Sequence, residues 1–410
     1  MLFSADRFEI AGDFLIPRSG SEWEGTHGSY ILDWDTRRWY LLIAPTECMP
    51  VHGTTDDDVE EGNDAIDILG KFFDVLSPDA YSITVDARGL LQSISPGGKA
   101  RPSQMHHTIP FKSAPHLEKC LTVHFSQLVE TDRIAPGVDR VFPQGQEHLD
   151  YVFKYGLTLM KDRFIWKEVS ILSMLPKHRH ILALEHVVLS DEPEPCILGF
   201  TSRFIAGGDL NNNPRPFKLK WLQQLTETLD FLNLELGIVN RDISAKNLLI
   251  DEVTDDIILF DFGIACTTAQ VEWRNDDVDD AVITLYEIIT HDDSVRQHYA
   301  YNGEISAAEI IFDKPTWLVK GELACEVSFL RKHVEEWYHR RLALLNDGSM
   351  DGIKNMIIPL RPAGFDLAQN SGAEGENLES NKRKWNSSCW ERPEKTEAFA
   401  WTKKQKLCVS

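Results

Sequence analysis

Residues 240–247 read NRDISAKN, and residues 261–263 read DFG. Asp261 follows Asp242 by 19 residues, and between them the apolar runs 248–250 and 257–260 flank an acidic turn. This pattern predicts two short antiparallel strands with a carboxylate at the mouth of each. Either motif alone occurs by chance, and Asp242 could simply cap a turn while Asp261 ends a strand. The two motifs in this order, around an apolar hairpin, favour a shared site instead.

The pair resembles the catalytic loop and the metal-binding DFG motif of the protein kinase superfamily, and its wording is similar to that of divergent fungal protein-kinase-like proteins. The resemblance implies ATP and Mg²⁺ as cofactors. It places Asp242 beside the attacking hydroxyl, and it places Asp261 and Asn247 on the metal. Phosphoryl transfer needs one carboxylate near the attacking hydroxyl, and a second carboxylate plus an amide on magnesium. Arg241, next to the aspartate, and Lys246, four residues after it, complete the implied catalytic set.

The elements upstream occur in the matching order. Residues 149–155 read LDYVFKY, a strand pattern that ends close to Lys154, which resembles the lysine that grips the phosphates. Glu168 lies within an apolar helical stripe, where a carboxylate is unfavourable unless it meets a partner. Taken singly, the two would be a surface lysine and a surface glutamate; taken together, they predict an ion pair.

The nucleotide site is implied by the same resemblance. The run 197–202 looks like the last strand of a small lobe, with Ser202 at the gatekeeper position. The backbone around Arg203 and Ile205 would then contact the adenine, and Leu249 would also line the nucleotide site. Gly137 is the single glycine in the stretch 134–139, where the family usually has a glycine-rich phosphate loop.

The large lobe is predicted by two helices. Residues 218–235 carry a leucine stripe, and residues 274–290 read RNDDVDDAVITLYEIIT, which resembles the buried central helix, with Asp277 bracing the catalytic loop. Three departures accompany the missing glycine loop. Asn240 replaces the usual histidine, only 16 residues lead from Asp261 to Asp277, and no A-P-E motif occurs there.

The predicted fold class is α+β, a two-lobed protein-kinase-like fold with an extra N-terminal α+β region and a disordered C-terminal tail. Residues 1–115 form the N-terminal region of unknown role, with a hairpin over 30–43 and an amphipathic helix over 65–76. Residues 116–205 form the small lobe and 206–345 the large lobe. Residues 346–410 lose periodicity and gain Gly, Asn, Ser and Glu, as is typical of a disordered tail.

Composition bounds the partners. The formal charge of −22 over 410 residues argues against nucleic acid, whose binding surfaces are basic. No apolar run approaches the ~20 residues of a membrane span, and the N-terminus lacks a signal-peptide pattern. Seven scattered cysteines indicate free thiols in a reducing compartment, so an intracellular protein, cytoplasmic or nuclear, is expected. The oligomeric state stays open.

Three functions fit these residues. The first is an ATP- and Mg-dependent protein kinase-like phosphotransferase acting on a protein substrate, with Ser/Thr hydroxyls as the commoner acceptors. The second is a pseudokinase or partner-binding scaffold, favoured by the degenerate glycine loop and by Asn240. The third is a small-molecule kinase, favoured by the short segment after Asp261. Arg241 beside Asp242, and the helix at Asp277, favour the first over the third.

Overall fold

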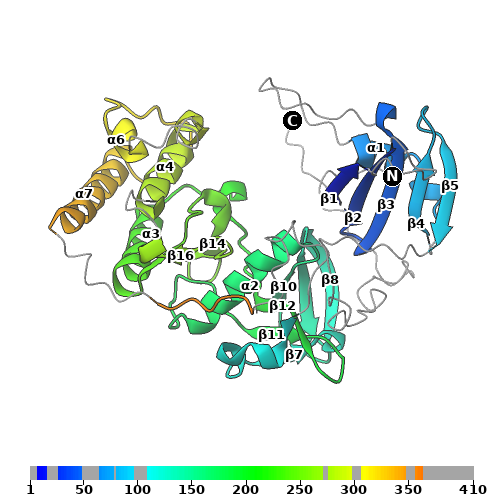
Figure 1. The fold of residues 1–410 in the computed structure, drawn as a ribbon. Coiled ribbons are helices and arrows are strands. Elements are labelled where there is room, and N and C mark those ends of the chain that lie inside the picture. The colour runs from blue at the N-terminus through cyan, green and yellow to red at the C-terminus, as the bar shows by residue number, and fades with distance from the viewer. Residues whose placement is uncertain are drawn as a thin grey trace.

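A computed structural model describes residues 7–15, 26–48, 64–77, 80–96, 109–270, 276–297, 306–347 and 356–362. Figure 1 shows three bodies in chain order: a blue N-terminal sheet, a cyan-to-green small lobe rich in strands, and a green-to-yellow large lobe rich in helices. The fold is therefore the predicted two-lobed α+β arrangement with an additional N-terminal sheet. Among the described residues, no helix combines the length and the apolar character needed to cross a bilayer.

The N-terminal body is a five-stranded sheet whose strands follow one another in chain order. Its strands are β1 (Phe8–Leu15), β2 (Thr26–Asp33), β3 (Arg38–Pro45), β4 (Ala80–Val85) and β5 (Leu91–Pro96). The predicted hairpin is present, because β2 and β3 pair from Thr26↔Pro45 to Asp33↔Arg38. Helix α1 (Asp64–Gly70) buries Leu69 against Leu42 and Ile83 of the sheet. The helix ends earlier than the apolar pattern predicts, at Gly70.

The small lobe is a seven-stranded sheet crossed by one long helix. Its strands are β6 (Ile109–Pro110), β7 (Thr122–His124), β8 (Leu128–Ala135), β9 (Val138–Pro143), β10 (Tyr151–Tyr155), β11 (His186–Leu189) and β12 (Cys196–Arg203). Helix α2 (Leu159–Met174) is preceded by Thr158, whose side chain accepts from the Lys161 N–H and caps the first turn. Strand β6 pairs with β12, so the sheet already includes residues from the range expected for the N-terminal region.

The large lobe packs helices around two short hairpins. Its helices are α3 (Leu219–Asp230), continued by a π-helix (Phe231–Glu235), then α4 (Asp276–Thr290), α6 (Ala307–Phe312) and α7 (Val327–Asn346). Its strands are β13 (Ile238–Val239), β14 (Leu248–Asp251), β15 (Asp256–Leu259) and β16 (Cys266–Thr267), paired as β13 with β16 and β14 with β15. Trp221, Ile283 and Trp337 are fully buried between the helices. The hairpin predicted between the two motifs is thus β14–β15.

Single 3-10 turns connect these elements. They are Thr46–Cys48, Phe73–Val75, Phe111–Ser113, Pro115–Leu117, Phe125–Gln127, Leu210–Asn212, Ala245–Asn247 and Thr268–Gln270.

One part of the predicted tail is packed against the folded body. The Met356 N–H donates to the Leu236 carbonyl, and the side chains of Met356 and Ile358 pack on the core of the large lobe. The segment 356–362 then reaches α2, where Arg361 pairs with Asp162 (Figure 1, orange). The disorder predicted for 346–410 does not describe these seven residues, because their apolar side chains find a surface to cover. Residues 348–355 and 363–410 lie outside the described residues.

Candidate active site

The backbone of the catalytic loop is hydrogen-bonded to one buried carboxylate, that of Asp277. Asp277, near the start of α4, accepts hydrogen bonds from the backbone N–H of Asn240 (2.9 Å) and of Arg241 (2.8 Å). It also accepts from Nδ2 of Asn233 on the π-helix (2.7 Å). Burial raises the pKa of Asp277, and these three donors oppose that shift by stabilising the carboxylate. The loop therefore has a fixed backbone, as the sequence predicts for Asp277.

Asn240 connects the two motifs. It is fully buried, its Nδ2 donates to the carbonyl of Asp261 (2.9 Å), and its Oδ1 accepts from the Asp242 N–H (3.1 Å). Arg241 (φ 70°) and Asp261 (φ 65°) both adopt the left-handed region, which is unfavourable for side chains with a Cβ and persists where the surroundings impose it. Asparagine thus performs the local hydrogen bonding that joins the loop to the DFG segment.

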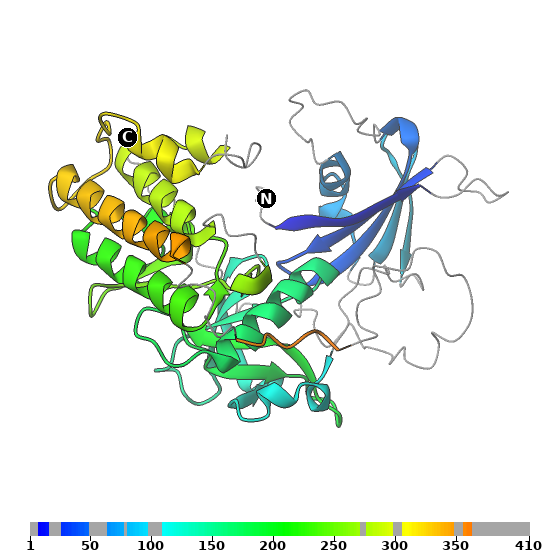
Figure 2. The same cartoon turned by 60° about the vertical axis from the view of Figure 1, so that its left-hand side comes forward.

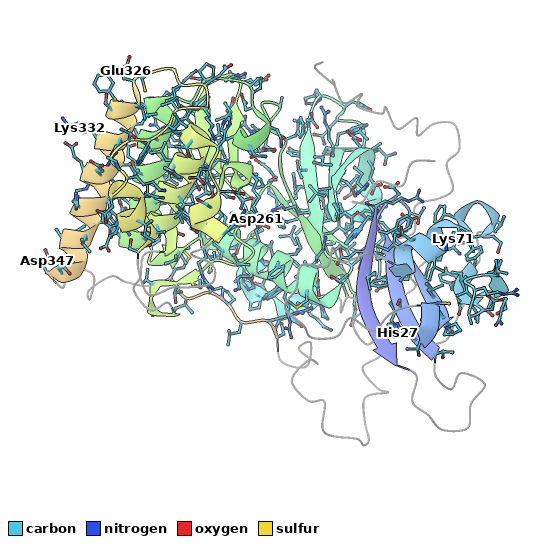
Figure 3. The ribbon with its side chains drawn as sticks, turned by 90° about the horizontal axis from the view of Figure 1, so that it is seen from above. His27, Lys71, Asp261, Glu326, Lys332 and Asp347 are labelled. Carbon is cyan, nitrogen blue, oxygen red and sulfur yellow. The ribbon has the colours of Figure 1, made fainter. Side chains whose placement is uncertain are left out.

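The predicted ion pair of the small lobe is present. Nζ of Lys154 lies 2.9 Å and 3.0 Å from the two carboxylate oxygens of Glu168, and 3.8 Å from Oδ2 of Asp261. Burial works against the charge on Lys154, but the carboxylates of Glu168 and Asp261 outweigh it and raise the pKa of the lysine. The lysine therefore stays a cation between the small lobe and the DFG segment (Asp261 is labelled in Figure 3).

The side of the loop that carries Asp242 and Lys246 is more open. The side chain of Asp242 is 32% exposed, and Nζ of Lys246, itself exposed, lies 3.7 Å from its carboxylate. Nδ2 of Asn247 donates to the Asp242 carbonyl (2.9 Å), which fixes the orientation of the amide. Arg241, beside Asp242, is exposed at the surface. A second molecule can therefore approach Asp242 and Lys246 from solvent.

Arg203 and Ile205, which the sequence predicts to lie in the hinge, stand at and just after the end of β12. The side chain of Arg203 points to Asp251, with a 2.8 Å ion pair, and the carbonyl of the buried Ile205 accepts from the Gly208 N–H. Leu249 lies on β14 and forms a bridge with Asp209, just beyond the hinge. The buried Ser202 borders a cavity of about 10 Å³, which has room for roughly one water. Lys154, Glu168, Phe260 and Phe262 also line this cavity.

The turn expected to cover the phosphates is very short. Ala135 pairs with Val138, so only Pro136 and Gly137 connect β8 to β9. Gly137 has φ +75°, and a Cβ there would lie 2.5 Å from the carbonyl oxygen of Tyr155. Both observations require glycine for the turn itself. The structure therefore gives Gly137 a backbone role, and the hairpin has few N–H groups to offer a phosphate.

Sequence reasoning missed a chain of polar contacts behind the loop. Arg341 of α7 donates to Oδ1 of Asn233 (2.9 Å) and pairs with Asp230 (2.9 Å), so α7 supports the residue that supports Asp277. On the other side, the Thr284 hydroxyl donates to the Ile243 carbonyl (2.8 Å). The one available signal was Asn233, an amide within a leucine-rich helical stripe, where a polar group requires a partner.

Comparison with known proteins agrees with this geometry. Residues 153–286 match the family model described as protein tyrosine and serine/threonine kinase. This region belongs to the protein kinase superfamily. The matched region begins after the Pro136–Gly137 turn and ends inside α4, so it contains the Lys154–Glu168 pair, the catalytic loop and the DFG segment.

Three curated relatives illustrate the similarity. The chain is 32% identical over 125 residues to "Serine/threonine-protein kinase CHK1" of Saccharomyces cerevisiae, covering 29% of this chain and 22% of that protein. It is 29% identical over 107 residues to "CBL-interacting serine/threonine-protein kinase 20" of Arabidopsis thaliana, covering 25% and 23%. It is 28% identical over 113 residues to "CBL-interacting serine/threonine-protein kinase 5" of the same plant, covering 26% and 24%. The chain thus spans less than a quarter of the length of these relatives.

Proposed function

We propose that this protein transfers the γ-phosphoryl group of Mg–ATP to a hydroxyl group of a protein substrate, on serine or threonine. The observation that carries the proposal is the arrangement of Lys154 between Glu168 and Asp261, with Nζ 2.9 Å and 3.8 Å from their carboxylates. A partly buried lysine cation, 12% exposed at its side chain and close to both Glu168 and Asp261, is suited to hold phosphate oxygens. The similarity to serine/threonine kinases supports the same acceptor class.

The residues present suit a magnesium ion. Mg²⁺ takes oxygen ligands, and the carboxylate of Asp261 and the amide oxygen of Asn247 are both of that kind. The amide NH₂ of Asn247 is engaged by the Asp242 carbonyl, which leaves its oxygen as the atom able to act as a ligand. When bound, the metal supplies charge neutralisation at the phosphates. Asn240 would position Asp261 for this role, through its bond to the Asp261 carbonyl.

The acceptor hydroxyl would be oriented by Asp242. Its carboxylate is partly exposed and its backbone is fixed through Asn240 and Asn247, so the side chain can accept a hydrogen bond from an incoming hydroxyl and take its proton late in transfer. Lys246, 3.7 Å away, contributes a positive charge near the same position. Arg203, Ile205 and Leu249 are assigned to the adenine side, and Gly137 to the phosphate side.

The test combines nucleotide binding with transfer. Mg–ATP should raise the Tm of the full chain by mass action, about 2.7 kcal/mol of added stability at a hundredfold excess over Kd. Lys154→Met should weaken that shift, whereas Lys119→Met, at an exposed lysine of the same lobe, should leave it unchanged. No shift with millimolar Mg–ATP would refute the proposal.

Transfer is measured with γ-labelled ATP, using casein and histone as protein acceptors and a panel of small alcohols. Asp242→Asn should abolish transfer and keep the Mg–ATP shift, whereas Asp261→Asn should lose both. Full transfer by Asp242→Asn would contradict the role of that carboxylate. Label on small alcohols alone would assign the protein to small-molecule kinases instead.

The second candidate is a pseudokinase that binds a partner without catalysis. The observation that favours it is the two-residue connection at Pro136–Gly137, which offers few N–H groups to the phosphates. It predicts that no transfer occurs in any arm of the assay. An intracellular location is part of the same proposal, since the five described cysteines are not paired as disulfides.

A further inference from the structure

The first turn of α2 is contacted from both sides by segments outside the kinase-like core. Lys161 meets the N-terminal sheet, and the next residue, Asp162, meets the segment 356–362. Figure 2 shows α2 with one end against the blue sheet and the orange segment running alongside it. Helix α2 carries Glu168, so whatever fixes its first turn also affects the Lys154–Glu168 pair.

The N-terminal sheet is firmly attached to the small lobe. Arg37, in the β2–β3 turn, is buried and pairs with Asp139 of β9 (2.6 Å) and with Glu130 of β8. Its Nε also donates to the hydroxyl of Tyr155 on β10 (3.0 Å). Trp34 joins the hydrophobic core of the small lobe beside Tyr155. The N-terminal sheet therefore contacts three neighbouring strands of the small lobe, β8, β9 and β10, and its position relative to that lobe is fixed.

On this support, four elements meet at Lys161. Its Nζ lies 3.1 Å from the Glu9 carboxylate and 4.4 Å from the ring centre of Trp34. It also lies 3.5 Å from the carbonyl of Pro136, in the short turn between β8 and β9. Nε1 of Trp34 donates to the same Glu9 carboxylate (3.0 Å), so Lys161, Glu9 and Trp34 each contact the other two. One lysine thus connects the N-terminal sheet, α2 and the phosphate-side turn.

On the other flank, Arg361 forms an ion pair with Asp162 that is nearly buried, with side chains 5% and 10% exposed. The same segment is fastened to the large lobe at Met356, whose N–H donates to Leu236. The contact therefore connects α2 to the large lobe rather than only to its own sheet. Removing one partner of a nearly buried ion pair strongly destabilises the folded state, because the remaining charge stays buried without the attraction that offset its desolvation.

Because α2 is a continuous helix, the position of its first turn determines the position of Glu168. Glu168 lies six residues after Asp162, about 9 Å along a helix with a rise of ~1.5 Å per residue. The start of α2 also packs tightly on the end of β10, where a Cβ on Gly156 would lie 2.6 Å from the Asp162 nitrogen. A displacement of the first turn therefore moves Glu168 relative to Lys154.

We propose that the N-terminal sheet and the segment 356–362 hold α2, through Lys161 and Asp162, in the position that pairs Glu168 with Lys154. Lys161, Asp162 and Arg361 are positioning residues, and α2 is fixed by the chain itself rather than by a separate partner. This proposal rests on the proposed phosphotransfer for its catalytic consequence. Its mechanical part, the anchoring of α2, is measurable without any activity.

The experiment uses the full chain with Arg361→Gln, Asp162→Asn, the double variant, and Lys161→Met for the opposite flank. Amide hydrogen exchange of α2 is compared with that of α7, a helix outside the contact. We expect exchange in α2 to rise about tenfold in each single variant, with α7 unchanged. We expect the double variant to recover part of the protection, because no unpaired charge remains. Lys112→Gln, which breaks the exposed Lys112–Glu194 pair of the same lobe, should match the wild type.

Transfer from γ-labelled ATP is measured on the same samples. We expect kcat to fall about tenfold in the single variants, while the KM for ATP changes less, because the reacting geometry is lost before binding is. Unchanged α2 exchange in all the single variants overturns the proposal, as does loosened α2 with wild-type kcat, or a rise in exchange shared equally by α7. If the wild type transfers no phosphate, the proposed function fails, and the exchange data alone decide whether α2 is anchored.

Discussion

Replacing Arg37 by methionine tests the attachment of the N-terminal sheet. The guanidinium is 2% exposed at its side chain and faces Asp139, which is fully buried, and Glu130, which is 15% exposed. Burial opposes the charge on Arg37, but Tyr155, Glu130 and Asp139 outweigh it and keep its pKa above the usual value. Methionine fills much of the same volume and removes the cation. The two carboxylates of Glu130 and Asp139 then lose the positive charge of Arg37.

Breaking a buried ion pair by removing one partner costs about 3–5 kcal/mol. A domain of about 150–250 residues shifts its Tm by roughly 2–4 °C for each kcal/mol of stability that is lost, so the expected decrease in Tm is about 6–20 °C. The double variant Arg37→Met with Asp139→Asn should recover part of that loss, because one of the two carboxylates that paired with Arg37 is then neutral.

The assay is thermal unfolding at pH 7, followed by near-UV circular dichroism. Arg88→Met is the matched control, because Arg88 is 78% exposed and its pair with Asp86 is screened by solvent, so its loss should leave the Tm nearly unchanged. If Arg37→Met and Arg88→Met unfold within about 1 °C of each other, the buried network does not hold the sheet in place and the reasoning is wrong.

Two further predictions concern Asn240 of the catalytic loop and His180, which lies between α2 and β11 of the small lobe. Asn240→Ala removes the bonds to the Asp261 carbonyl and to the Asp242 N–H in a fully buried place. We expect a stability loss of about 2 kcal/mol by chemical denaturation and at least a tenfold lower transfer rate; wild-type values would contradict it. His180 is buried, and burial lowers its pKa below the usual 6.5, so the unfolded chain takes up the proton first as pH falls. The Tm should be level above about pH 6.5 and decline below it, less steeply in His180→Gln; parallel curves would refute this.

The elements around the site follow from local patterns. The apolar runs 248–250 and 257–260 became β14 and β15, the leucine stripe became α3, and the run 197–202 became β12 (Cys196–Arg203). Each of these signals is contained within about 20 residues, since periodicity and turn chemistry act over short distances. The pairing of Lys154 with Glu168 was also readable, because a lone carboxylate in an apolar helical stripe requires a partner.

The contacts made by the N-terminal sheet and by the segment 356–362 had no such local signal. Arg37 and Tyr155 lie 118 residues apart, and Arg361 and Asp162 lie 199 residues apart, yet each pair shares a hydrogen bond. In the sequence, Arg37 belongs to a polar turn and Arg361 to a segment predicted as a disordered tail. A charged side chain becomes buried only when two surfaces meet, and no local periodicity records which surfaces those are. The sequence by itself determined the kinase-like motifs and the strands and helices that carry them. Only the tertiary structure decided which side chains hold α2, because that depends on where the two flanking segments come to rest.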